Sequence, residues 1–170
     1  MAPTAKLTER LMLDRLNTRY SRTYANGMHK MLRYSGAEHV RITAGFESRR
    51  TADYIAMDLW PNYGKSLDLI GHEVKVSRAD WLSELRDPDK AETLKMHMDR
   101  WYLVVSDPAI VKPGELPEGW GLMVASGVGL RVTALAPKLN PLPVPKTFLA
   151  CLLRATARTA KSMALAEAGS

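Results

Sequence analysis

The residues best suited to chemistry lie in the apolar run Ile70–Val76, where Glu73 and Lys75 are two positions apart. Residues i and i+2 of a strand point to the same face, so a carboxylate and an ammonium group would emerge side by side. Asp53 lies near the start of the preceding apolar run. If the two runs pair, the three residues meet at one end of a sheet. Two carboxylates can hold a hard divalent cation and a lysine can orient or activate water, which predicts metal-assisted phosphodiester hydrolysis.

A solvated surface strand with a paired Glu and Lys would show the same letters, so the context of the motif matters. Its flanks are apolar, Asp53 lies one hairpin upstream, and a helix signal follows directly. Ser77 is a good N-cap, and Asp80 stands where a capping box has its acid. Asp58 and Asp68 are rivals to Asp53, but Asp58 has the opposite strand parity and Asp68 lies at a turn.

The expected cofactor is Mg²⁺ or Mn²⁺, bound by oxygen atoms alone. The histidines are scattered, with no Cys or His at the spacing of zinc ligands: His29, His39, His72 and His97. We expect Asp53 and Glu73 to bind the ion, with a backbone carbonyl near Val74 as a further ligand. Lys75 would position or activate water. His72 alternates with Glu73 and should lie on the opposite side of the strand.

The order Asp53 … Glu73-Val74-Lys75 resembles the PD-(D/E)XK nuclease signature. Longer stretches are similar to small MmcB-like DNA-repair proteins, and the similarity covers roughly residues 45 to 135. Four segments carry it: Arg49–Asp53, Glu73–Trp81, His97–Val105 and Leu116–Ala125.

This resemblance implies a restriction-endonuclease-like αβββαβ core with a mixed central sheet, and a metal-dependent deoxyribonuclease activity. It also implies contacts with DNA from four residues: Arg49, Arg50, Ser77 and Lys90. The chain departs from the family pattern by the extra residue Thr51, by a longer loop between residues 60 and 68, and by Glu92 where the family usually has proline.

The net charge of +6 is concentrated at the start of the chain, since residues 1–50 hold ten Lys and Arg against four Asp and Glu. Such an excess indicates a surface for a polyanion, although a solvated helix face would look the same. The planar fork of arginine suits phosphate oxygens. The residues expected to hold DNA phosphate are Arg15, Arg19 and Arg22.

The composition indicates one domain, because 170 residues with 46% apolar content can bury a sizeable core. The single cysteine, Cys151, excludes an internal disulfide and fits the reducing cytoplasm. The N-terminus mixes apolar and charged residues, unlike a signal peptide. Since no apolar run reaches about twenty residues, no membrane span is expected.

Periodicity and turn residues predict these elements: a helical stretch over 5–35; strands over 40–46, 51–60 and 67–76; helices over 77–86 and 89–97; a strand over 100–106; a hairpin over 121–125 and 130–135; and a helix over 147–166. Short turns argue for antiparallel neighbours among the first three strands, and a helical crossover makes the fourth parallel to a member of the sheet. We divide the single domain, residues 1–170, as follows: a basic N-terminal helical segment 1–36, a core 38–135, a proline-rich linker 136–146 and a C-terminal helix 147–166.

These features together predict a metal-dependent nuclease that acts on DNA in repair or recombination. Two alternatives stay open. One is a DNA-binding module that keeps the nuclease fold without turnover, and the other is a dimeric junction resolvase. The oligomeric state is open, with a homodimer included.

Overall fold

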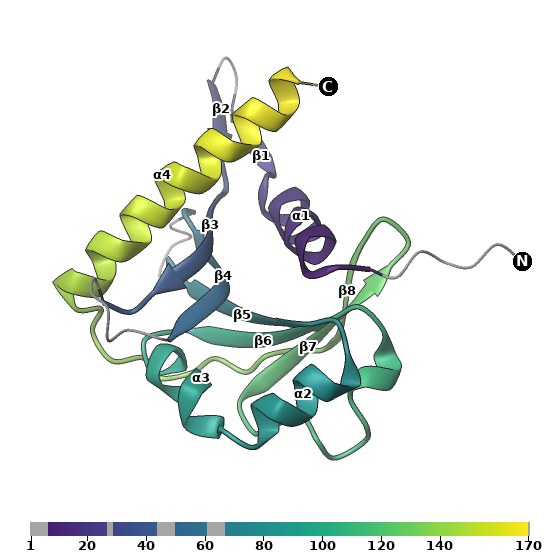
Figure 1. Ribbon diagram of the computed structural model, residues 1–170. Helices are drawn as coiled ribbons and strands as arrows, with labels where there is room; N and C mark the ends of the chain where they lie inside the picture. Colours follow the sequence, from purple (N-terminus) through teal and green to yellow (C-terminus); the bar gives the residue numbers. More distant parts are fainter. Residues whose placement is uncertain (1–6, 27–28, 44–49, 61–66, 170) are drawn as a thin grey trace, which may run out of the picture.

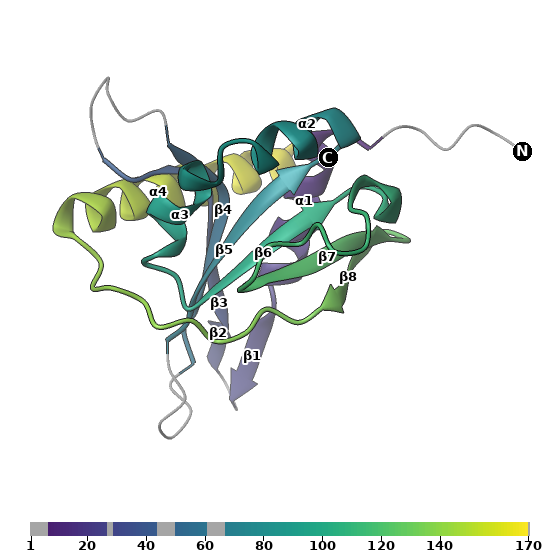
Figure 2. The same cartoon turned by 90° about the horizontal axis from the view of Figure 1, so that it is seen from below.

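The computed structural model describes residues 7–26, 29–43, 50–60 and 67–169, with the backbone alone for residues 24–26, 29 and 30. A six-stranded sheet forms its centre, and its strands follow one another in chain order (Figures 1 and 2). The strands are β3 (Tyr34–Arg41), β4 (Thr51–Asp58), β5 (Leu69–Lys75), β6 (Arg100–Val105), β7 (Trp120–Ser126) and β8 (Gly129–Ala134). The helices are α1 (Glu9–Tyr20), α2 (Arg78–Leu85), α3 (Pro88–Lys95), α4 (Lys146–Ala168) and the short 3₁₀ helix η1 (Pro108–Ile110). A separate hairpin consists of β1 (Thr23–Asn26) and β2 (His29–Leu32).

The central sheet is mixed. β3, β4 and β5 are antiparallel neighbours, β5, β6 and β7 run parallel, and β8 returns antiparallel to β7. α2 and α3 form the crossover from β5 to β6, which parallel neighbours require. The predicted αβββαβ order and mixed sheet are therefore confirmed by α1, β3 to β5, α2 and β6, with β7, β8 and α4 added at the end.

The sheet buries an apolar cluster on each face, with α1 on one side and α2 and α3 on the other (Figure 1). α1 contributes Met12, Leu13 and Leu16, whose spacing places them on one side of the helix. On the opposite face, Trp81 of α2 and Leu94 of α3 are fully or almost fully buried. Because β6 is covered on both faces, its apolar residues form an unbroken run rather than alternating with polar ones.

His72 of β5 lies on the α1 face, opposite to Glu73, as the alternation predicts. Its Nε2 is 2.8 Å from the hydroxyl oxygen of Tyr20, and the rings of Tyr54 and Tyr102 pack around it. Burial lowers the pKa of His72 to about 3, so the ring is neutral in the folded protein.

We expect the free energy of unfolding to fall with pH below about 6.5, because the unfolded chain then binds a proton at His72 that the folded protein does not. The folded-state pKa is the lower one, so stability is lost as the pH falls toward 3. At pH 5 this residue should cost about 2 kcal/mol. Urea unfolding of the wild type and His72→Gln at pH 7 and pH 5 measures the effect. Equal losses in the two proteins would contradict it.

The predicted helical stretch over residues 5–35 is wrong beyond Tyr20. α1 ends there, and Thr23–Asn26 pairs with His29–Leu32 as the antiparallel strands β1 and β2. The dipeptide Asn26-Gly27 is a strong hairpin signal, and it outweighs the helical spacing of the apolar residues around it. The segment 1–36 is therefore a helix followed by strands.

The predicted strand over 40–46 starts too late, since β3 begins at Tyr34 and ends at Arg41. Residues 44–46 of that prediction lie outside the described residues. Gly36, at the end of the predicted helical segment, lies inside β3 and opposite Ala56 of β4. A Cβ atom at this position would collide with the hydroxyl group of Tyr54, so glycine is needed for the close approach of that ring. The other predicted strands and helices agree with the structure to within two residues at each end.

α4 covers the outer edge of β3 (Figure 1). The hydroxyl oxygen of Thr159 accepts a hydrogen bond of 3.0 Å from the backbone N–H of Glu38, and Arg158 donates one of 2.8 Å to the carbonyl oxygen of Glu38. These bonds satisfy backbone groups that an uncovered edge strand would offer to another chain. None of the described helices, α4 included, is long and apolar enough to cross a membrane.

Candidate active site

Asp53 lies where β4 and β5 separate. The two strands pair as far as Tyr54 opposite His72. Beyond that point the side chain of Asp53 bridges the gap, because its Oδ2 accepts a hydrogen bond of 2.7 Å from the backbone N–H of Val74. The carboxylate is thereby fixed at the open end of the strand pair.

β5 presents Glu73 and Lys75 on the same side, as their spacing predicts. The Nζ atom of Lys75 is 2.6 Å from Oε1 of Glu73, and both side chains are almost buried. Asp53, Glu73 and Lys75 line one cavity of about 330 Å³, which we call the triad cavity. The expected meeting of these side chains at one end of the sheet is present, and their catalytic roles stay a prediction.

The triad cavity also contains Glu84, a buried residue of α2 that sequence reasoning missed. Its Oε2 atom is 3.0 Å from Nζ of Lys75 and 3.1 Å from Nζ of Lys90. Lys90 Nζ is in turn 3.8 Å from Oε1 of Glu73. Two glutamates and two lysines therefore alternate around a ring of opposite charges, which holds Lys75 between two carboxylates.

Burial and neighbouring charges set the protonation of these groups. Burial, and then the charge of Asp53, raise the pKa of Glu73, while the ammonium group of Lys75 opposes this shift. Burial likewise raises the pKa of Asp53 itself. Burial acts in the same direction on Glu84, but the two lysines outweigh it and hold the pKa of Glu84 below its usual range. A divalent cation beside Asp53 and Glu73 would remove the cost of ionising both carboxyl groups.

We expect Glu84→Gln to lower the free energy of unfolding by about 2 to 3 kcal/mol, because Lys75 stays buried after losing one of its two partners. The contribution of Glu84 should be present at neutral pH and fade in acid, since its lowered pKa means that protonation removes the charge. Urea denaturation measures the change. The control is Glu92→Gln, which affects an exposed pair with Lys95 and should cost less than about 1 kcal/mol. Equal effects would contradict the buried ring.

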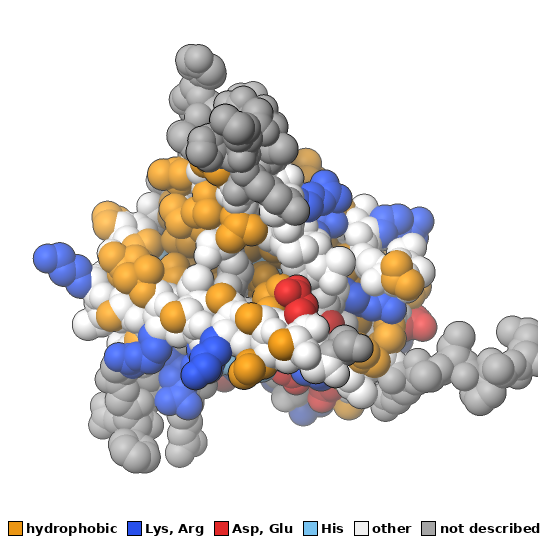
Figure 3. All heavy atoms as spheres, turned by 90° about the horizontal axis from the view of Figure 1, so that it is seen from above, with side chains coloured by type: hydrophobic (Ala, Val, Ile, Leu, Met, Phe, Trp, Pro, Cys, Tyr) orange, Lys and Arg blue, Asp and Glu red, His pale blue; other side chains and the backbone are white. Residues whose placement is uncertain are grey.

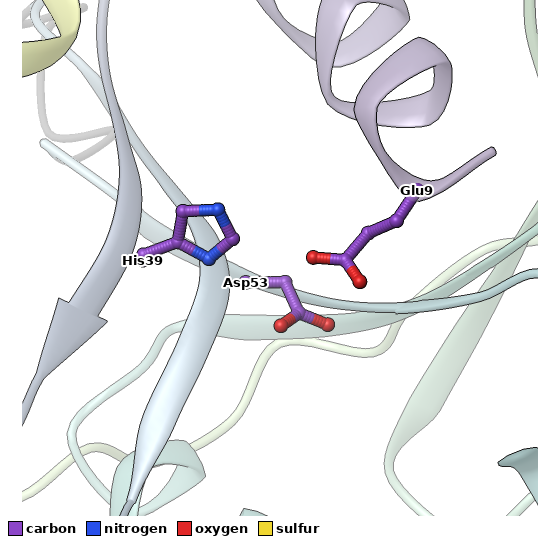
Figure 4. Close-up of side chains that lie close together, drawn as sticks. All are labelled: Glu9, His39 and Asp53. Atoms are coloured by element: carbon purple, nitrogen blue, oxygen red, sulfur yellow. The ribbon is translucent and has the colours of Figure 1, made fainter.

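A second group of possible metal ligands meets at Asp53 (Figure 4). Ligand atoms of Glu9, His39 and Asp53 all lie within 4.8 Å of one another. Glu9 comes from the first turn of α1. His39 and Asp53 both lie between the paired positions Glu38 opposite Tyr54 and Val40 opposite Ala52. Carboxylate oxygens and an imidazole nitrogen are suitable donors for Mn²⁺ and other divalent cations.

An irregularity in the sheet turns these side chains toward the start of α1. Ala52 packs in the cluster on the α2 face, whereas Tyr54 packs in the cluster on the α1 face. Strict alternation would place the two on one face, so β4 changes face at Asp53. Across from it, His39 has a φ angle of 49°, in the left-handed region that non-glycine residues rarely adopt.

The sequence points to oxygen ligands alone, but the structure adds His39 to the ligand group. Glu73, expected to share a metal with Asp53, lies outside this group among the described residues and is engaged by lysines. The sequence around Glu9 and His39 does not mark either residue as a metal ligand. Glu9 reaches Asp53 through the packing of α1, and His39 reaches it through the alignment of β3 with β4. Glu84 could have been found, since it lies three residues after Trp81 in the buried stripe of α2.

The residues that resemblance assigns to DNA lie in different places. Lys90 lines the triad cavity. Ser77 caps α2 by accepting a hydrogen bond from the first turn of that helix, and it lines another cavity. Arg50 donates a hydrogen bond of 3.0 Å to the carbonyl oxygen of Asp89. Arg49 lies outside the described residues.

The N-terminal arginines expected to hold phosphate are not among the residues that line the triad cavity. Arg15 donates a hydrogen bond of 2.8 Å to the carbonyl oxygen of Gly129, and Arg19 donates one of 3.4 Å to that of Leu130. Both carbonyl groups belong to β8, at the opposite edge of the sheet from β3. Arg22 is exposed. The structure therefore does not bring these arginines together with Asp53.

Comparison with known proteins bears on the fold. No protein-family model matches the chain, and no curated protein matches it. Among solved structures, SPO1766, a protein of unknown function from Silicibacter pomeroyi, is similar with a TM-score of 0.55 and 18% sequence identity. The alignment covers 98% of this chain and 92% of that chain. At this level of identity the likeness shows a shared fold alone.

Proposed function

We propose that the protein is a metal-dependent nuclease of the PD-(D/E)XK type that hydrolyses phosphodiester bonds in DNA during repair or recombination. The observation that carries the proposal is the meeting of Asp53, Glu73 and Lys75 in one cavity at the fork between β4 and β5. A sheet holds these groups more rigidly than a loop would, and they are the components that metal-assisted hydrolysis needs.

The donor set fits a hard divalent cation such as Mg²⁺ or Mn²⁺. Asp53, fixed through its Oδ2, would be the shared ligand. Further ligands would come from Glu9, His39, Glu73 and the backbone carbonyl near Val74. A bound cation would polarise the phosphate and lower the pKa of an attacking water.

Lys75 is positioned to act as a charged group. Burial alone would lower the pKa of Lys75, but the carboxylates of Glu73 and Glu84 outweigh this effect and raise it. The side chain is therefore an ammonium group at neutral pH. In that form it can orient the water and stabilise the negative charge that develops on the phosphate, rather than accept a proton.

DNA is the proposed partner, on the strength of the net charge of +6 and its concentration in the first fifty residues. Lys90 lines the triad cavity, and Arg50 bonds to the adjacent residue Asp89, so both would contact a phosphate there. Arg15, Arg19 and Arg22 would contact DNA along α1. A cytoplasmic location is part of the proposal and is supported by the unpaired Cys151.

The test is to incubate the full chain with single-stranded, duplex, flapped and branched DNA in Mg²⁺, Mn²⁺ or EDTA. We expect cleavage products with metal and none with EDTA. Preference for branched DNA by a dimer in solution would identify a junction resolvase. If no substrate is cut with either metal, the nuclease proposal fails.

One observation favours a second candidate, a DNA-binding module without turnover. Glu73 is already engaged by Lys75 and Lys90, so this carboxylate has cationic partners without a metal ion. Calorimetry with Mn²⁺ separates the two functions. A nuclease should bind Mn²⁺ and lose that binding when Asp53 is changed. A DNA-binding module without turnover should bind DNA tightly and show no Mn²⁺ binding that depends on Asp53.

A further inference from the structure

A groove of about 710 Å³ runs between the β3–β4 pair and α4, and it contains none of the residues that sequence reasoning assigned to DNA. We call it the basic groove. Its floor comes from the two strands, with Arg41 opposite Thr51, and with His39 and Asp53 lining it as well. These side chains line the groove together, on both sides of the point where β4 changes face.

α4 forms the wall of the basic groove. Cys151, Arg154, Ala155 and Arg158 line it, at the spacing of three and four that defines one side of a helix. Cys151 and Ala155 are small and buried, so the helix lies close to the strands, while the two arginines are exposed. Figure 3 shows Lys and Arg side chains gathered along one margin of the upper face of the molecule, beside an area of hydrophobic side chains.

The positive charge of the basic groove is not neutralised by the described part of the chain. Arg41 and Arg154 are exposed and form no ion pair there, and Arg158 donates to the neutral carbonyl groups of β3. Among the described residues that line the groove, Asp53 is the one acidic residue. Arg10, in contrast, is engaged by two carboxylates. The groove is therefore suited to an anion with several negative charges.

Asp53 connects the basic groove with the triad cavity, since it lines both. A chain of phosphates lying along Arg41 and Arg154 would reach this carboxylate at the end of the groove. The two cavities thus form one path, positive along α4 and the strand pair, and ending at the residues proposed to bind metal.

We propose that the basic groove binds the sugar-phosphate backbone of one DNA strand, with Arg41 and Arg154 as phosphate contacts, and directs that strand to Asp53. The inference rests on the proposed function for the path of the substrate, but binding itself requires no catalysis. Arginine binds phosphate oxygens in pairs, and such contacts position a strand without reading its sequence.

The first test measures binding by fluorescence anisotropy with labelled oligonucleotides in EDTA, where no cleavage occurs. Arg41→Glu and Arg154→Glu should each weaken binding about tenfold and lower the slope of log affinity against log salt by about one, for unrelated sequences alike. The matched control is Arg131→Glu, an exposed position on β8 at the far edge of the sheet, which should bind as the wild type does. Folded groove variants with wild-type affinity and slope, or an equal loss in the control, would overturn the proposal.

The second test uses Cys151, which is the sole cysteine of the chain and lines the basic groove. A bound oligonucleotide should slow the reaction of this thiol with a small methanethiosulfonate, in the wild type and in Arg131→Glu. If DNA binds without slowing the reaction of Cys151, the proposal that the basic groove binds DNA is overturned. Protection of Cys151 without cleavage of any substrate would leave the groove in place and overturn the nuclease activity alone.

Discussion

Lys75→Ala should lower the rate of phosphodiester cleavage by about 10²- to 10⁴-fold, the range that a positioned charge or proton-transfer group contributes. The ammonium group of Lys75 is held 2.6 Å from Glu73 and 3.0 Å from Glu84, so its position is fixed before substrate arrives. DNA affinity should change little, because the proposed phosphate contacts lie elsewhere. Single-turnover cleavage with saturating protein separates the rate of chemistry from binding.

Two further variants keep this prediction decisive. Lys75→Arg retains a positive charge between the two glutamates, so it should restore stability to the fold and recover part of the rate at most. Lys112→Ala removes an exposed lysine and should cleave as the wild type does. A folded Lys75→Ala protein with full activity would exclude this lysine from the chemistry and move the site.

Asp53→Asn should weaken Mn²⁺ binding on the order of a hundredfold and abolish cleavage. Asp53 is the residue common to the triad cavity and to the group with Glu9 and His39, so either arrangement of ligands loses its centre. The amide oxygen of asparagine can still accept the hydrogen bond from Val74, so the fork between β4 and β5 should survive. Isothermal titration calorimetry gives the affinity.

Asp58→Asn is the matched control for this change, because Asp58 lies on the same strand but pairs with Arg33 outside the triad cavity. It should bind Mn²⁺ as the wild type does. Equal affinity in the wild type and Asp53→Asn would place the metal elsewhere. His39→Ala then distinguishes the two ligand groups, since only a site that includes the imidazole should weaken.

Local patterns were enough to predict the part of the fold that carries Glu73 and Lys75. An apolar run followed by Ser77 predicts a buried strand and a capped helix, and β5 and α2 follow it closely. The pairing of β4 with β5 was also predictable, because two consecutive strand-like runs with no helix between them favour antiparallel neighbours. Asp53 could therefore be placed beside Glu73 without knowledge of tertiary packing.

The rest of the candidate site depends on contacts between distant segments. His39 reaches Asp53 through the alignment of β3 with β4. The start of β3 was not predicted, because the apolar spacing before it indicated a helix and Gly36 indicated the end of that helix. Glu9 arrives through the docking of α1, and the basic groove exists only once α4 lies against β3. Net charge pointed to α1 for DNA, but charge counts along the chain cannot tell which arginines the fold already engages, as it does Arg15 and Arg19.

The cover that α4 gives to β3 has a consequence for how the chain is made. β3 ends at Arg41, whereas the helix that satisfies its outer edge begins at Lys146. A ribosome makes the chain from its N-terminus, so the sheet can assemble while its first edge is still bare. Until the last helix emerges, that edge is open to pairing with a neighbouring nascent chain. Termination before residue 146 should accordingly yield aggregates rather than a smaller folded protein.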